Sequence, residues 1–219
     1  MPLLLGLIVP SSHHGLCLLL LLFLGCTPGK KVKQSVSPVG RFAAVTSTAK
    51  TGAVHDPAGF CEKTYPNSGP KAKSFVWPPL KPLPVQRGPS KIKVDGRWVW
   101  LNLWATWCKP CMAEMALLGR WAKSLNAEGL GIDLRLMSID DPSAGHALAN
   151  QIERGLPGPT IWLRGKDDFV PFLTHLGLDA SAAIPIHALI DPSGKLRCVR
   201  VGVIHDVDFA AVKGIIRGG

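Results

Sequence analysis

The chain has 219 residues and a formal net charge of +10, and this charge is concentrated in one part of the sequence. Residues 26–97 carry 13 Lys and Arg side chains against three acidic ones, whereas residues 98–219 carry 12 of each sign. The length suits one domain preceded by a long basic segment and leaves no room for a second well-packed domain. No aromatic-interleaved basic face accompanies the charge, so the composition argues against a nucleic-acid partner.

The first predicted segment is an apolar run at Leu16–Leu24. Such a short run is typical of the core of a signal peptide and falls short of the roughly 20 residues that span a bilayer. It ends in Phe-Leu-Gly-Cys, which is similar to the cleavage box of bacterial lipoproteins, with Cys26 as the lipidated residue. We therefore expect residues 1–25 to be a signal peptide; an ordinary secretory signal, or an uncleaved anchor that also uses Leu3–Val9, is the alternative. Every version exports the chain to an oxidising compartment, on the periplasmic side of a membrane.

Residues 26–88 form a basic lead-in that is rich in Pro, Ser, Gly and Lys. It has too few large apolar residues to bury a core, so we expect a disordered tether. Its cationic side chains suit anionic lipid headgroups, at about 1 kcal/mol for each Lys or Arg held close to the surface. Within this segment, residues 75–80 are expected to lie on the domain edge as extended chain, because their prolines prevent a helix.

Residues 89–219 alternate between strand and helix patterns. The predicted strands are Lys91–Val94 and Arg97–Trp104, joined in a hairpin by Asp95-Gly96, then Ile132–Ile139, Thr160–Leu163, and a second hairpin of Ile186–Ile190 and Leu196–Val203 with a type I turn at Asp191–Gly194. The predicted helices are Lys109–Asn126, Pro142–Arg154, Asp167–Leu176 and Asp206–Ile216. This alternation predicts an α/β fold in which one central mixed sheet is flanked by helices.

The most specific chemistry lies where the strand that ends at Trp104 gives way to a helical pattern. That junction reads Cys108-Lys109-Pro110-Cys111, and cysteines at this spacing can close into a disulfide and reopen. A helix N-terminus stabilises a thiolate, so Cys108 is predicted to attack a disulfide in a partner protein. Cys111, one turn further along, is predicted to displace that partner and leave both cysteines oxidised. A structural disulfide or half a zinc site is disfavoured, because no second CxxC or spaced His pair completes four ligands.

Residues 101–115, LNLWATWCKPCMAEM, resemble the active-site segment of thioredoxin-fold proteins, and in detail that of the membrane-tethered TlpA/ResA-type thiol–disulfide oxidoreductases. Ile184-Pro185, followed by a strand and the turn at 191–194, resembles the cis-proline loop and hairpin of the same family. The resemblance covers residues 89–219 and implies a thioredoxin-like fold with an extra N-terminal hairpin. It also implies a cis bond before Pro185, which would face the cysteines, and an Ile184 backbone that can pair with a substrate strand.

Two polar residues flank the cysteine pair. Asn102 occupies the place where thioredoxins hold a buried Asp, and an amide cannot accept a proton. Glu114 is the candidate substitute, because it shares a helical stripe with Leu118, Trp121 and Leu125 that predicts partial burial. The resemblance implies that this carboxylate tunes the thiols; a surface Glu without a role is the alternative.

Trp107, Pro110 and Ile184 are the predicted substrate-contact residues beside the pair. Of the other cysteines, Cys61 and Cys198 are either two separate thiols or a bridge that joins the lead-in to the second hairpin. The histidines do not cluster in the sequence and are expected to be structural or superficial: His146, His175, His187 and His205.

The leading interpretation is an exported, membrane-anchored protein-disulfide reductase that needs no cofactor or resident metal. The resemblance implies disulfide-bearing client proteins, apocytochromes awaiting haem among them, and a membrane protein as electron donor. Lys109-Pro110 between the cysteines resembles the reducing members of the family. One alternative is a copper-delivery module that uses Cys108, Cys111 and His187, although copper carriers of this fold favour CxxxC. The other is a peroxiredoxin-like antioxidant, whose Pro and Thr before the reactive cysteine are absent here.

Overall fold

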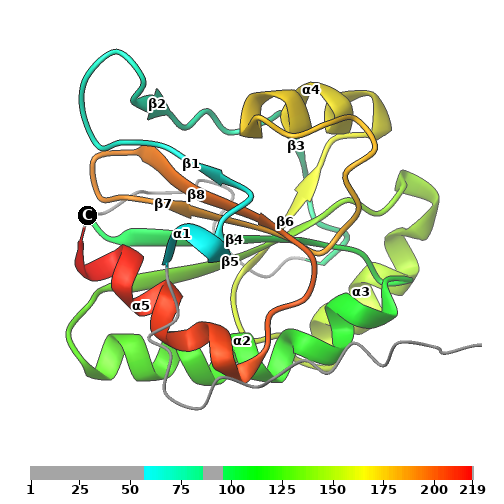
Figure 1. Ribbon diagram of the computed structural model, residues 1–219. Helices are drawn as coiled ribbons and strands as arrows, with labels where there is room; N and C mark the ends of the chain where they lie inside the picture. The colour runs from blue at the N-terminus through cyan, green and yellow to red at the C-terminus, as the bar shows by residue number, and fades with distance from the viewer. Residues whose placement is uncertain (1–56, 86–95, 219) are drawn as a thin grey trace, which may run out of the picture. The chain divides into compact units, whose positions relative to one another are not determined.

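The computed structural model describes residues 57–85 and 96–218. Its strands are β1 (Lys63–Thr64), β2 (Lys73–Ser74), β3 (Leu80–Lys81), β4 (Trp98–Trp104), β5 (Ile132–Ser138), β6 (Thr160–Leu163), β7 (Ile186–Ile190) and β8 (Lys195–Val201). Its helices are α1 (Pro57–Phe60), α2 (Lys109–Ala127), α3 (Gly145–Glu153), α4 (Lys166–Leu176) and α5 (Phe209–Arg217), with short 3₁₀ turns η1 (Pro142–Ala144) and η2 (Asp206–Asp208). The strands form one sheet in the order β1-β8-β7-β4-β5-β6-β3, and β2 also pairs with β8 (Figure 1).

The mixed sheet confirms the predicted α/β class, and the elements predicted from residue 97 onward all appear close to their expected bounds. The predicted helix after Ile139 is divided between η1 and α3, and the last predicted helix between η2 and α5. Of the predicted N-terminal hairpin, the strand Arg97–Trp104 is present as β4, and Lys91–Val94 lies outside the described residues.

Strand β4 is the centre of the sheet, and all seven of its residues are buried. It pairs in parallel with β5 and antiparallel with β7. A strand covered on both faces is expected to be apolar throughout, which explains the unbroken sequence WVWLNLW. Alternation sends Trp100 and Trp104 to one core, with α2, α3 and α5, and Leu101 and Leu103 to the other, with α4. Figure 1 shows α2 and α5 together on one side of the sheet and α4 on the other.

Helix α2 starts directly after the loop that follows β4 and carries the cysteine pair at its first turn. Its N-cap is Cys108, and Pro110 is tolerated in the first turn because no intrahelical N–H bond is lost there. The predicted stripe is confirmed: Glu114 is buried together with the apolar residues Leu118, Trp121 and Leu125. One face of the helix therefore carries both a thiol and a carboxylate into the interior.

Residues 57–85 lie against both edges of the sheet, so the prediction of a disordered tether over 26–88 is wrong for this part. Strands β1 and β2 pair with β8, and β3 pairs with β6 at the opposite edge. The disulfide between Cys61 and Cys198 answers the question that the sequence left open. Average composition hid this order, because a covalent crosslink, three short edge pairings and a few buried anchors such as Phe60 hold the segment. Covering the edges also removes templates for unwanted strand pairing.

The predicted signal peptide, the lipidation site Cys26 and residues 26–56 of the tether lie outside the described residues. Within the part of the chain that is described, no helix has the length and apolar character needed to cross a bilayer.

Candidate redox active site

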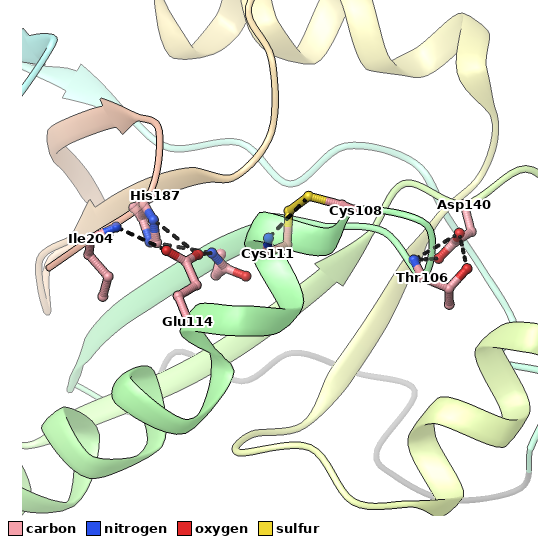
Figure 2. Close-up of a disulfide and its surroundings, with 8 residues drawn as sticks. Thr106, Cys108, Cys111, Glu114, Asp140, His187 and Ile204 are labelled. Atoms are coloured by element: carbon pink, nitrogen blue, oxygen red, sulfur yellow. Dashed lines mark hydrogen bonds and ion pairs between the residues drawn. A yellow bond between two sulfur atoms is a disulfide. The ribbon is translucent and has the colours of Figure 1, made fainter. Parts of the chain in front are cut away.

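The cysteine pair forms a disulfide across the first turn of α2 (Figure 2). The Cα atoms of Cys108 and Cys111 are 5.3 Å apart. The backbone N–H of Cys111 donates to the Cys108 Sγ at 3.2 Å, so this sulfur takes the place of a capping side-chain oxygen. The backbone N–H of Cys108 donates in turn to the carbonyl oxygen of Ala105 at 3.0 Å. After reduction, the same N–H and the positive end of the helix would stabilise a Cys108 thiolate.

Exposure differs sharply along the motif. Trp107 is 65% exposed, and Lys109 and Pro110 are exposed beside it, whereas Cys108 is only 4% exposed. Cys108 is therefore nearly buried in the oxidised protein, where its sulfur bonds Cys111, although exposed residues lie on both sides of it in the sequence. Cys111 is fully buried, as expected of the second cysteine of the pair.

The bond between Ile184 and Pro185 is cis, as the resemblance implied. This loop immediately precedes β7, and the antiparallel register places Ile186 opposite Leu103, near the end of β4. The loop therefore lies beside the C-terminal end of β4, where the chain continues to Cys108. The Pro185 carbonyl oxygen accepts a hydrogen bond from Gly202 N at 2.8 Å, so the end of β8 holds the loop in place. Pro185 is buried and Ile184 is half-buried.

A buried polar cluster lies on the other side of Cys111 and is built around Glu114. The Glu114 carboxylate is 2% exposed; its Oε1 accepts from Asn102 Nδ2 and its Oε2 from Ile204 N, both at 3.0 Å. His187 Nε2 lies 3.4 Å from Glu114 Oε1. Figure 2 shows His187 and Ile204 beside the Glu114 carboxylate. The alternative of a surface Glu is thereby excluded.

His187 is the residue of this cluster that sequence reasoning missed. The sequence indicated a structural or superficial residue, but His187 is the direct register partner of Asn102 across β7 and β4. The available signal was its place two residues after Pro185 in a strand, opposite a buried Asn. Only the pairing of the two strands turns that spacing into a contact.

Asp140 is a second missed residue, and it holds the loop that leads to Cys108. It follows β5, which runs parallel to β4, and its carboxylate faces Thr106 in that loop (Figure 2). Both carboxylate oxygens accept from Thr106 N, at 3.1 and 3.0 Å, and Oδ1 also accepts from Thr106 Oγ1 at 2.8 Å. Ser138 Oγ donates to Oδ2 at 2.8 Å. Polar residues just beyond a strand end were the signal for this anchor.

Replacing Asp140 by Ala is expected to lower the free energy of unfolding by about 3 kcal/mol, because it leaves buried donors without partners. Urea unfolding of the oxidised protein measures this loss. Asp141→Ala is the matched control. The Asp141 carboxylate is exposed and caps η1 by accepting hydrogen bonds from Ser143, so we expect its loss to cost about 1 kcal/mol. Equal losses in the two variants would show that Asp140 does not anchor the loop.

No metal site accompanies the cysteines: within residues 57–85 and 96–218, no three His, Cys, Asp or Glu side chains converge so as to hold a metal ion. Both ring nitrogens of His187 already face protein groups, since Trp100 Nε1 donates to Nδ1 and Glu114 lies beside Nε2. The Cys108–Cys111 pair has the spacing and bonding that disulfide exchange requires.

No protein-family model matches the chain. Among curated proteins, the thiol-disulfide oxidoreductase ResA of Bacillus thuringiensis (strain Al Hakam) is 27% identical over 138 residues, which cover 63% of this chain and 71% of that protein. ResA of Geobacillus thermodenitrificans (strain NG80-2) is 28% identical over 151 residues, which cover 68% of this chain and 78% of that protein.

Solved structures with a similar arrangement include a secreted thiol-disulfide isomerase from Corynebacterium glutamicum, at 25% identity and a TM-score of 0.45, covering 56% of this chain and 72% of that one. A thiol:disulfide interchange protein from Chlorobium tepidum TLS has 20% identity and a TM-score of 0.43, covering 57% of this chain and 81% of that one. The fold assignment rests on the strand order and not on these scores. The chain is therefore a thioredoxin-like thiol–disulfide oxidoreductase that is similar to ResA, with this strand order and a cysteine pair at the start of the helix after its central strand.

Proposed function

We propose that this protein reduces disulfides in client proteins outside the cytoplasm. The observation that carries the proposal is the Cys108 sulfur at the cap of α2, where the Cys111 N–H and the helix dipole favour a thiolate. The thiolate attacks one sulfur of a client disulfide, forms a mixed disulfide and releases a client thiolate. Cys111, as a thiolate, then attacks the Cys108 sulfur and releases the second client thiolate. Two electrons pass to the client, and the Cys108–Cys111 disulfide remains.

Client contact is assigned to the exposed surface beside the pair. Trp107 and Pro110 present their side chains to solvent on either side of Cys108. The Ile184 backbone precedes β7 at the same end of the sheet, and an extended client segment can pair with it as a short strand. Main-chain pairing of this kind tolerates many client sequences, which suits a reductase with several substrates.

Export and membrane anchoring complete the proposal. Residues 1–25 would direct export, and lipidated Cys26 with the basic residues after it would hold the domain at a membrane. The Cys61–Cys198 disulfide supports an oxidising compartment, because such crosslinks rarely persist in the cytosol. A membrane electron donor would reduce the Cys108–Cys111 disulfide after each turnover. Apocytochromes awaiting haem are the clients that the family resemblance suggests.

The reduction potential of the Cys108–Cys111 couple tests the direction of electron flow. We expect a value nearer to that of thioredoxin, about −270 mV, than to that of DsbA, about −120 mV. Equilibration with glutathione buffers of known ratio, followed by alkylation of free thiols, measures it. A potential near that of DsbA would make the protein an oxidant of its clients and overturn the proposal.

Copper delivery is the alternative that the same protein sample tests. The geometry offers it no support, because the only His that was proposed as a ligand, His187, engages Trp100 and Glu114. Titration of the reduced protein with Cu(I) should therefore show no dependence on His187. Tight, stoichiometric binding that is lost with His187 would replace the reductase proposal by a copper-carrier function.

A further inference from the structure

His187 lies in β7, and its ring is next to Glu114 of α2, the helix that carries the cysteine pair. Across β4, β7 and β8 it is the register partner of Asn102 on one side and of Arg200 on the other. Its side chain is 2% exposed, and its ring contacts the edge of the Trp100 indole. A buried, titratable ring at this place needs its hydrogen-bonding groups accounted for.

The neighbours of His187 determine which ring nitrogen carries the proton. Trp100 Nε1 lies 3.3 Å from His187 Nδ1, and an indole N–H can only donate. Asn102 Nδ2 also lies 3.3 Å from Nδ1 while it donates to Glu114, so its second N–H points at the same ring nitrogen. A proton on Nδ1 would face the N–H groups of both Trp100 and Asn102, with no acceptor for it. These contacts make Nδ1 the acceptor and place a ring proton on Nε2.

That Nε2–H faces one acceptor, Oε1 of Glu114, at 3.4 Å. The separation is longer than an ordinary hydrogen bond, and Nε2 has no closer partner among the described residues. The Glu114 carboxylate thus accepts hydrogen bonds from Asn102 and Ile204, and His187 Nε2 lies beside its Oε1.

Other charged groups near the cluster have partners of their own. Arg200, on β8 beside His187, donates to the Phe60 and Val203 carbonyl oxygens and lies 3.9 Å from Asp208 Oδ2 at the start of α5. On α2, the group nearest to Glu114 in sequence is Cys111, three residues earlier on the same buried face. Glu114 and Cys111 therefore share one buried face of α2, and His187 lies beside the Glu114 carboxylate.

We propose that His187 is a positioning residue for the resolving step, acting through Glu114. It orients the carboxylate from its place beside Oε1, so that Glu114 can accept the proton of the Cys111 thiol. The resulting thiolate attacks the Cys108 sulfur, the bond from Cys108 to the client breaks, and the client thiolate leaves with the electron pair. Glu114 afterwards returns its proton to water. This inference rests on the proposed disulfide exchange but not on the identity of the client.

Single-turnover reaction of the reduced protein with Ellman's reagent separates the two sulfur attacks. The first release of thionitrobenzoate reports the attack by Cys108, and the second reports the attack by Cys111 on the mixed disulfide. In His187→Leu the carboxylate loses the N–H group beside Oε1, so we expect the pH midpoint of the second phase to rise. The pH profile of the first phase should not change. His187→Gln, which can place an N–H where Nε2 lies, should keep the wild-type midpoint.

Nitrogen-15 NMR of the wild-type protein provides a readout that requires no variant to fold. We expect the shifts of His187 to report a protonated Nε2 and an unprotonated Nδ1 in both redox states. The opposite tautomer, or a second phase in His187→Leu with the wild-type midpoint, would overturn the proposal. A reduction potential near that of DsbA would instead overturn the proposed direction of electron flow and leave the role of His187 standing, so the two failures are distinguishable.

Discussion

Replacing Cys108 by Ser is expected to abolish disulfide exchange, whereas replacing Cys111 by Ser is expected to stop it halfway. Only the Cys108 sulfur occupies the helix cap, where the N–H of Cys111 and the helix dipole favour the thiolate. Without that nucleophile, turnover should fall by at least ~10³-fold. Without Cys111, the first attack still proceeds, but no thiol remains to release the client, so a mixed disulfide accumulates.

Non-reducing gel electrophoresis and mass spectrometry with a disulfide-bearing protein substrate measure both outcomes. Cys111→Ser should give an adduct that dithiothreitol releases, and Cys108→Ser should give none. The Cys61–Cys198 crosslink must remain intact in both variants, since otherwise its thiols could form adducts of their own. An adduct on Cys111 in the Cys108→Ser protein would reverse the assigned roles. In cell extracts, the trapped adduct would also identify the client.

Removing the Cys61–Cys198 crosslink is expected to produce the largest loss of stability. The two cysteines are separated by 137 positions, and closure of a loop of that length in the unfolded chain is worth about 5 kcal/mol. The crosslink also keeps α1 and β1 on β8, so we expect the double variant Cys61→Ala/Cys198→Ala to release this segment. Urea unfolding gives the stability, and protection of β1 amides from hydrogen exchange reports the attachment.

The cysteine pair of the active site supplies a matched control, because its two members are separated by only 3 positions. By the same loop-closure argument, Cys108→Ala/Cys111→Ala should cost about 2 kcal/mol. Equal losses in the two double variants would contradict the view that the long crosslink stabilises the fold by restricting the unfolded chain. Retained protection of β1 without the crosslink would show that strand pairing alone holds the N-terminal segment.

Two disulfides of different kinds thus lie in one domain. Cys198 is buried in β8 and pairs with a residue from the N-terminal segment, whereas Cys108 and Cys111 share the end of a helix beside exposed residues such as Trp107. The first disulfide therefore joins segments far apart in the chain, whereas the second closes a single helical turn.

Local pattern was enough to predict the strands, helices and reactive pair of the domain. The run WVWLNLW leads into a CxxC and an amphipathic stripe, and these features depend on residues within a few positions of each other. Glu114 could be placed in the interior for the same reason, since a helical period links it to Leu118 and Trp121. The order of residues 57–85 could not be predicted in this way, because it depends on Cys198 and on the sheet edges far along the chain.

By itself, then, the sequence determined the fold class and the cysteine pair at the helix start, because short-range periodicity and spacing encode a strand, a helix and two thiols within bonding reach. Only the tertiary structure decided that His187 meets Glu114, that Asp140 holds the loop before Cys108, and that Cys61 bonds Cys198. Each of these contacts joins residues more than 30 positions apart. Strand register and chain crossovers create such contacts, and neither can be predicted from a single local segment.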